Sequence, residues 1–240
     1  MFIDNKFIFL SLPRCASTSF HISCIRHDLD IKHCNYLMDT PITNELKSLS
    51  NIDLVYNIKH IHEQLVELKA KFGYEYPVIS VKRNKYDRFV SYYNHVVGQL
   101  YRMGEVELYT KLKNISTNKL LSYTRDTIAD KKTIEEYIPI FLKSMGVEAY
   151  NTKLNRLLMP IFAPLSYYHS NDSNIIWFDF DKIYELEEWV SKICNIDFKM
   201  EIFGSSKEHS TNIIVDDNFI ERYEMIYSSY ENLKKEKSLI

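Results

Sequence analysis

The sequence from Phe7 to Ile25, FIFLSLPRCASTSFHISCI, joins an apolar run to a turn and then to an amphipathic stretch. Pro13 and Arg14 interrupt the apolar run, three hydroxyl residues follow, and an apolar face resumes at helical spacing. A strand that leads directly into a helix leaves backbone N–H groups and the positive end of the helix dipole at the junction. The segment therefore predicts a turn that holds an anion.

The rest of the chain alternates between short apolar runs and amphipathic stretches, which predicts strands alternating with helices. We expect Gly73 to end one of these helices. The mostly apolar run that follows it is typical of a central strand in a parallel sheet. The predicted strands are Lys6–Leu12, Asp53–Ile58, Pro77–Val81 and Asn174–Phe178, and the predicted helices are Ser17–Arg26, His62–Phe72, Asp87–Tyr101, Leu186–Cys194 and Asp217–Lys235.

This alternation predicts an α/β fold class, in the form of a P-loop-like three-layer fold with a central parallel sheet flanked by helices. A chain of 240 residues with 45% hydrophobic residues can bury a sizeable core, and we expect one domain spanning residues 1–240. Residues 104–168 are mainly helical in pattern, and we interpret them as a helical insertion into that domain.

Composition excludes several classes of protein. The formal net charge of −2 argues against a nucleic-acid-binding surface, which usually needs a strongly basic face. The apolar runs are far shorter than the roughly 20 residues that cross a bilayer. The first residues resemble no signal peptide, so we expect a cytoplasmic protein.

The cysteines agree with that location. Cys15, Cys24, Cys34 and Cys194 show no CxxC spacing, which favours reduced thiols over disulfides. A zinc site is not expected from this spacing either, and we expect no metal cofactor.

Three polar motifs follow three of the predicted strands and should meet at one edge of the sheet. They are Pro13–Ser19, His60–His62 and Arg83–Ser91. Ligands of parallel sheets bind beyond the carboxyl ends of the strands, so this shared edge is the predicted site. The first motif lacks the GxxxxGK[ST] pattern of nucleotide triphosphatases, which weakens a kinase interpretation.

Two of these motifs resemble the sulfotransferase superfamily, whose sulfuryl donor is 3′-phosphoadenosine 5′-phosphosulfate (PAPS). Pro13–Phe20, PRCASTSF, resembles its 5′-phosphosulfate loop and is most similar to the loop of the heparan and uronyl 2-O-sulfotransferases. Val81–Tyr93, VKRNKYDRFVSYY, resembles its 3′-phosphate motif, in which an arginine and a serine eight positions later bind that phosphate. The resemblance implies a P-loop-like fold and PAPS as donor, with 3′-phosphoadenosine 5′-phosphate (PAP) as product.

Two further segments extend the resemblance less specifically. His60-Ile61-His62 is similar to the HxH segment of the 2-O group, and Lys207–Asn212 resembles the late loop that closes over the nucleotide. Residues 104–168 show hardly any resemblance, and acceptor specificity would lie there. The implied acceptor is a hydroxyl, most simply that of a carbohydrate.

The resemblance implies a role for each motif. Arg14 would stabilise the sulfuryl group and the leaving oxygen, although the 2-O group has lysine there. His62 would be the general base, with His60 as the next candidate. Arg83 and Ser91 would bind the 3′-phosphate. The predicted donor-binding residues are Arg14, Cys15, Ala16, Ser17, Thr18, Ser19, Arg83, Ser91, Lys207 and His209.

Each assignment has a structural alternative. Ser17–Ser19 can serve as a helix cap, and Arg83 can pair with Asp87 while Ser91 is an ordinary helical serine. Arg14 can be a surface cation beside a turn, and His62 can be a residue at the start of a helix with no catalytic task. Lys207 and His209 can belong to a solvated loop. For the whole protein, a PAP- or anion-binding protein without turnover and a kinase-like phosphotransferase are the alternative functions.

Overall fold

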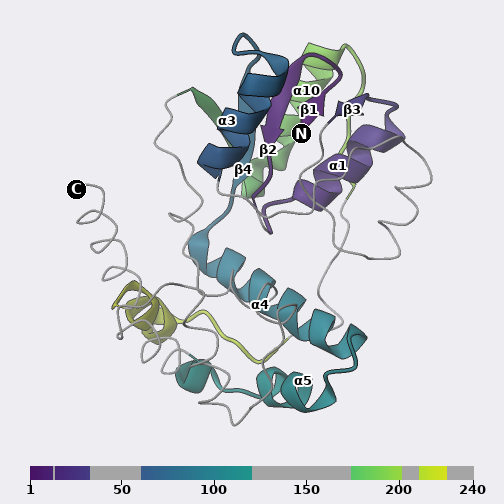
Figure 1. Ribbon diagram of the computed structural model, residues 1–240. Helices are drawn as coiled ribbons and strands as arrows, with labels where there is room; N and C mark the ends of the chain where they lie inside the picture. Colours follow the sequence, from purple (N-terminus) through teal and green to yellow (C-terminus); the bar gives the residue numbers. More distant parts are fainter. Residues whose placement is uncertain (13, 33–60, 121–173, 202–210, 226–240) are drawn as a thin grey trace. The chain divides into compact units, whose positions relative to one another are not determined.

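Figure 1 shows the computed structural model of the chain. It describes residues 1–12, 14–32, 61–120, 174–201 and 211–225, and residues 61–63 by their backbone alone. The chain divides into two units. Met1–Asn84 with Tyr167–Ser205 form the sheet unit, and Lys85–Ser166 with Ser206–Ile240 form the helical unit.

The described part of the sheet unit contains a five-stranded sheet with the order β3-β1-β2-β4-β5. Strands β2, β4 and β5 run parallel to one another, as the sequence predicts. Strands β1 and β3 are antiparallel to their neighbours, so the sheet as a whole is mixed and the predicted parallel arrangement holds for β2, β4 and β5. The strands are β1 (Phe2–Ile3), β2 (Phe7–Leu10), β3 (Ile31–Lys32), β4 (Val78–Lys82) and β5 (Ile175–Asp179).

A tight turn creates the antiparallel part of the sheet. Asp4 and Asn5 have φ values of 49° and 52°, and the Lys6 N–H donates to the Ile3 carbonyl at 2.9 Å. Two central residues with positive φ suit the right-handed twist of a hairpin, and Asp and Asn tolerate this conformation. The turn therefore folds β1 back onto β2.

Helices cover both faces of the sheet (Figure 1). Phe20 of α1 (Ser17–Arg26) stacks on Phe9 of β2 at 4.1 Å, and Trp189 of α10 (Ile183–Cys194) meets Phe7 at 5.1 Å between ring centroids. Phe7 and Phe9 share one face of β2 because side chains alternate along a strand. α3 (Ile61–Phe72) covers the other face, where its last residue stacks on Phe2. The sheet unit is thus α/β, with an aromatic core on the α1 side.

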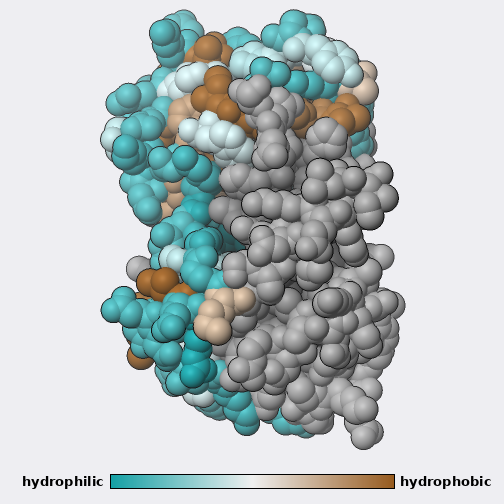
Figure 2. All heavy atoms as spheres, turned by 90° about the vertical axis from the view of Figure 1, so that its left-hand side faces the viewer, coloured by the Kyte–Doolittle hydropathy of each residue, from teal (hydrophilic) through white to brown (hydrophobic). Residues whose placement is uncertain are grey.

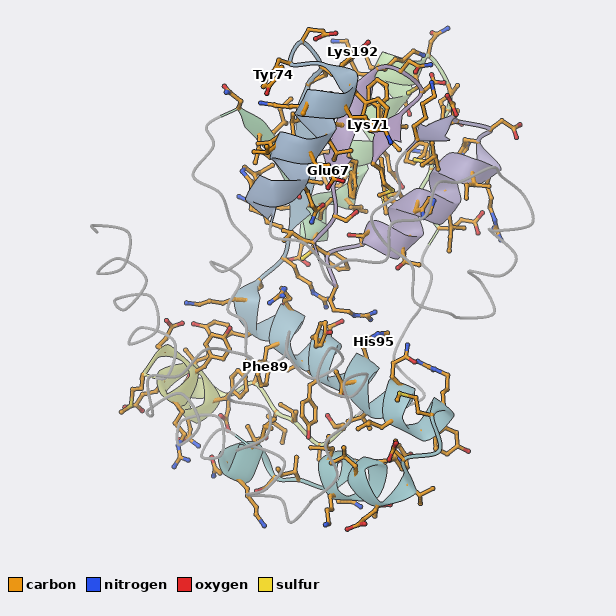
Figure 3. The ribbon with its side chains drawn as sticks, in the orientation of Figure 1. Glu67, Lys71, Tyr74, Phe89, His95 and Lys192 are labelled. Atoms are coloured by element: carbon orange, nitrogen blue, oxygen red, sulfur yellow. The ribbon has the colours of Figure 1, made fainter. Side chains whose placement is uncertain are left out.

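The helical unit is built around α4 (Lys85–Arg102). Phe89 of α4 lies 5.7 Å from the rings of both Phe219 and Tyr223, in helical residues 217–225 (Figure 3). The buried Tyr93 hydroxyl donates to the Leu112 carbonyl at 2.9 Å, which fixes α5 (Val106–Lys113) against α4. The aromatic side chains of α4 and of residues 217–225 are therefore packing surfaces.

The predicted elements agree with the structure within one to three residues at most ends. α1 has the predicted bounds, and Gly73 ends α3 with a φ of 119° and an N–H bond to the Lys69 carbonyl. α4 extends two residues beyond the predicted helix at its first end and one at its last. The predicted strand Asp53–Ile58, most of residues 104–168 and the end of the predicted terminal helix lie outside the described residues.

Exposed apolar side chains occur in both units. In Figure 2 the coloured surface of one face is mainly hydrophilic, with apolar residues in separate spots. Scattered apolar residues of this kind are normal on protein surfaces. The exposed large ones among the described residues are Val66, Tyr74, Tyr101, Met103, Val106, Ile176, Tyr184, Ile214, Val215 and Met225.

Candidate functional site

The carboxyl ends of β2 and β4 bring two of the predicted motifs to one edge of the sheet. The two strands are parallel neighbours in which Leu10 pairs with Ser80, and the Ser80 hydroxyl donates to the Leu10 carbonyl at 2.8 Å. Arg14 follows Leu10 by four residues, and Arg83 follows Ser80 by three. The two arginines therefore come from turns that leave the sheet at the edge where ligands of parallel sheets bind.

The turn after β2 has an unusual backbone. Arg14 and Ala16 have φ values of 63° and 62°, in the left-handed region that non-glycine residues rarely adopt. The Cys15 N–H and the Ser17 hydroxyl both donate to the Leu12 carbonyl, at 3.2 Å and 2.8 Å, and hold the turn closed. Backbone strain of this kind is common where a turn is shaped for a ligand.

The first turn of α1 is suited to an anion. The first α-helical bond runs from the Phe20 N–H to the Ala16 carbonyl, so the amides of Ser17 and Thr18 have no acceptor within the helix. The first turn of α1 also carries no acidic residue that would neutralise the helix dipole. The capping alternative is wrong at the N-cap, because Ala16 occupies it and no side chain caps the helix there.

α3 is fixed to the same edge by a residue that the sequence did not single out. Gln64 is 3% exposed, accepts a bond from the Ser11 N–H and donates one to the Ser11 carbonyl, both at 3.2 Å. Ser11 is the first residue after β2. His62 lies in the first turn of α3, two residues before Gln64, and is described by its backbone only. His60 lies outside the described residues.

Arg83 stacks on an aromatic ring that follows the next strand. Its guanidinium carbon lies 4.3 Å from the ring centroid of Phe180, the first residue after β5. Lys82, at the end of β4, forms an ion pair of 3.3 Å with Asp179 of β5. Nothing in the sequence pattern predicts a role for Phe180.

The other predicted contacts to the 3′-phosphate belong to the helical unit. Ser91 is half-buried on α4. Lys207 and His209 lie outside the described residues, which resume at Thr211. The Asn94 side-chain oxygen accepts bonds from the Thr211 N–H at 3.0 Å and from its hydroxyl at 2.6 Å. Ser91 and Asn94 are three residues apart and therefore share a face of α4.

His21, inside α1, is a poor candidate for a general base. It is 2% exposed, and burial together with the positive charge of the Met1 amino group lowers its pKa from 6.5 to about 4. The imidazole is therefore neutral at neutral pH and has little access to a substrate.

The part of the chain that the structure describes contains neither a disulfide nor a group of side chains arranged for a metal ion. Cys15, Cys24 and Cys194 are buried there and form no disulfide, while Cys34 lies outside it. The same residues contain no group of three or more His, Cys, Asp or Glu side chains arranged for a metal ion.

What these residues can do chemically is bind an anion. The helix dipole, the amides of the α1 start and the charge of Arg14 suit a phosphate or sulfate group, and Arg83 offers a second positive charge on the neighbouring strand. None of the described helices has the length and apolar character needed to cross a membrane. No protein-family model, curated protein or solved structure matches the chain.

Proposed function

We propose that the protein is a PAPS-dependent sulfotransferase that transfers a sulfuryl group to a hydroxyl acceptor, most simply a carbohydrate hydroxyl. The acceptor oxygen attacks sulfur in line, the bond between sulfur and the 5′-phosphate oxygen breaks, and PAP leaves with the electron pair. The acceptor proton passes to a histidine base. The resemblance to the 2-O-sulfotransferases supplies the identity of the donor and the acceptor class.

The observation that carries the proposal is the pairing of two positive turns on neighbouring parallel strands. The Arg14–Ser19 turn opens α1 after β2, and Arg83 follows β4 at the same edge. A donor with a phosphate group at each of two positions needs two such anion sites. PAP carries a 3′-phosphate and AMP does not, so Arg83 distinguishes the two nucleotides in this proposal.

The roles of individual residues follow from charge and chemistry. Arg14 stays protonated at all relevant pH values, so it stabilises the growing negative charge on the bridging oxygen and does not donate a proton. Amides from Ala16 to Thr18 and the Thr18 hydroxyl bind the 5′-phosphate, together with Ser19, whereas the Cys15 N–H already donates to the Leu12 carbonyl. The Ser17 hydroxyl already donates to Leu12. Because it does, the Ser17 contribution comes mainly from its backbone N–H.

The remaining donor contacts and the base rest on the sequence resemblance. Ser91, Lys207 and His209 complete the contacts to the 3′-phosphate side of the nucleotide. His62 accepts the acceptor proton, with His60 as the alternative, because the ordinary pKa of histidine lies near neutrality. The proposal assigns no step to a metal ion.

The test is calorimetric binding of PAP, AMP and ATP to the full chain without metal. We expect tighter binding of PAP than of AMP, and this preference should be lost in Arg83→Ala. Lys82→Ala is the matched control, because it removes a neighbouring positive charge that is paired with Asp179. Equal binding of PAP and AMP by the unsubstituted protein would overturn the proposal.

A transfer assay then separates the alternatives. Transfer of labelled sulfate from PAPS to a carbohydrate acceptor supports the enzyme. Tight PAP binding without transfer to any hydroxyl acceptor supports a binding protein without turnover. Magnesium-dependent use of ATP supports a kinase-like phosphotransferase.

A further inference from the structure

Arg83 and Phe180 occupy equivalent positions on two neighbouring strands. β4 and β5 are parallel, and the last pair in their register is Lys82 with Asp179. Arg83 and Phe180 are the first residues after the two strands, and both are half-buried. The guanidinium carbon of Arg83 lies 4.3 Å from the Phe180 ring centroid, well inside the range of a cation–π contact.

A guanidinium group has five N–H donors, and those that do not contact the ring in a cation–π pair remain for other partners. Within the described residues of the sheet unit, the ring of Phe180 is the partner that the structure gives Arg83. Asp179, the residue before Phe180, forms an ion pair with Lys82. Arg83 is therefore held in place by an uncharged ring, and its charge is not neutralised by that carboxylate.

We infer that Phe180 is a positioning residue for Arg83. The ring fixes the plane of the guanidinium at the carboxyl end of β4, so that the N–H edge is already oriented for a bidentate contact with a phosphate group. Arginine and phosphate form such paired hydrogen bonds when the guanidinium is correctly oriented. The inference rests on the proposed function, since it assigns the 3′-phosphate of the donor to this edge.

The experiment compares PAP and AMP binding by calorimetry in three variants of the full chain. Phe180→Leu removes the ring and keeps an apolar side chain, and we expect PAP affinity to fall about 3- to 10-fold with AMP affinity unchanged. Phe180→Tyr keeps the ring and should retain the PAP affinity of the unsubstituted protein. Tyr184→Leu is the matched control, because Tyr184 is an exposed aromatic residue of α10.

A double-mutant cycle distinguishes positioning from a general effect on folding. In the Arg83→Ala background, Phe180→Leu should cause no further loss of PAP affinity, because the ring acts through that arginine. If Phe180→Leu lowers the affinities for PAP and AMP equally, or leaves the PAP affinity unchanged, the inference about Phe180 is overturned and the proposed function is not. Equal binding of PAP and AMP by the unsubstituted protein would instead overturn the proposed function and, with it, this inference.

Discussion

At the scale of a single side chain, the proposed transfer depends on one histidine base. His62→Ala should lower turnover about 10²- to 10⁴-fold and leave PAP affinity nearly unchanged, because a base acts on the acceptor and not on the nucleotide. Steady-state transfer from PAPS and calorimetry with PAP measure the two effects. His60→Ala is the companion variant. If it causes the larger loss of turnover, the base is His60.

A second residue-scale prediction concerns pH. The folded pKa of His21, about 4, lies below the ordinary 6.5, so below pH 6.5 the unfolded chain takes up a proton that the folded chain does not. The His21 linkage should therefore leave the free energy of unfolding unchanged above pH 6.5 and lower it as the pH drops toward 4, by an amount on the order of 3 kcal/mol.

Urea unfolding across that range measures the effect of His21. The difference between the unsubstituted protein and His21→Leu isolates this residue from other titrating groups. NMR of the imidazole provides a second measurement that needs no variant. If the His21 imidazole of the folded protein takes up its proton near pH 6.5, the lowered pKa is contradicted.

At the scale of elements, Gln64 links α3 to the end of β2. Gln64→Leu keeps the size of the side chain but leaves the Ser11 N–H and carbonyl without their present partner. We expect the free energy of unfolding to fall by about 2 to 4 kcal/mol, as measured by urea unfolding. Val66→Ala, on the exposed face of α3, should change it by less than about 0.5 kcal/mol. A similarly small effect in Gln64→Leu would show that apolar packing alone holds α3.

The second link between elements is Asn94, which accepts two hydrogen bonds from Thr211. Asn94→Leu removes the acceptor for both, and we expect a loss of about 1 to 3 kcal/mol in the free energy of unfolding. Asn94→Asp keeps an oxygen acceptor and should retain most of the stability. Thr211→Val separates the hydroxyl bond from the backbone bond. Equal destabilisation by the Leu and Asp variants would mean that these bonds contribute little.

The length of an element decides whether the sequence predicts it. α1 and α4 have a periodic apolar pattern, so the sequence predicts the bounds of α1 and comes within two residues of those of α4. β1 and β3 have two residues each and therefore no periodicity to detect, although Asp4-Asn5 is a hairpin signal that could have indicated the first of them.

For the candidate site, the sequence identifies residues that follow strands but not the residues that hold them. Arg14 and Arg83 could be predicted, because each follows an apolar run. Gln64 and Phe180 could not, since each contacts a residue far away in the sequence, as Gln64 does with Ser11, 53 positions apart. Such pairings depend on the register of the sheet and on helix packing, which no local pattern encodes.

At the scale of the whole molecule, the small net charge means that the proposed anion binding would depend on nearby groups alone. The formal net charge of −2 provides no long-range attraction for a nucleotide with several negative charges. Under the proposed function, affinity for PAP would come from direct contacts with the start of α1 and with Arg83. Bound PAP should accordingly stabilise the part of the fold that supplies those contacts.

Ligand-linked unfolding tests this expectation on the intact chain. At a PAP concentration of about 100 times its dissociation constant, the free energy of unfolding should rise by about 2.7 kcal/mol. For a chain of this length, the corresponding rise in melting temperature is about 5 to 10 °C. AMP at the same concentration should produce a smaller rise, because it lacks the phosphate that Arg83 is proposed to bind. Hydrogen exchange should slow in β2 and β4, whose ends carry the two positive turns. Equal stabilisation by PAP and AMP would mean that the 3′-phosphate contributes nothing, and the two-anion arrangement would lose its functional meaning.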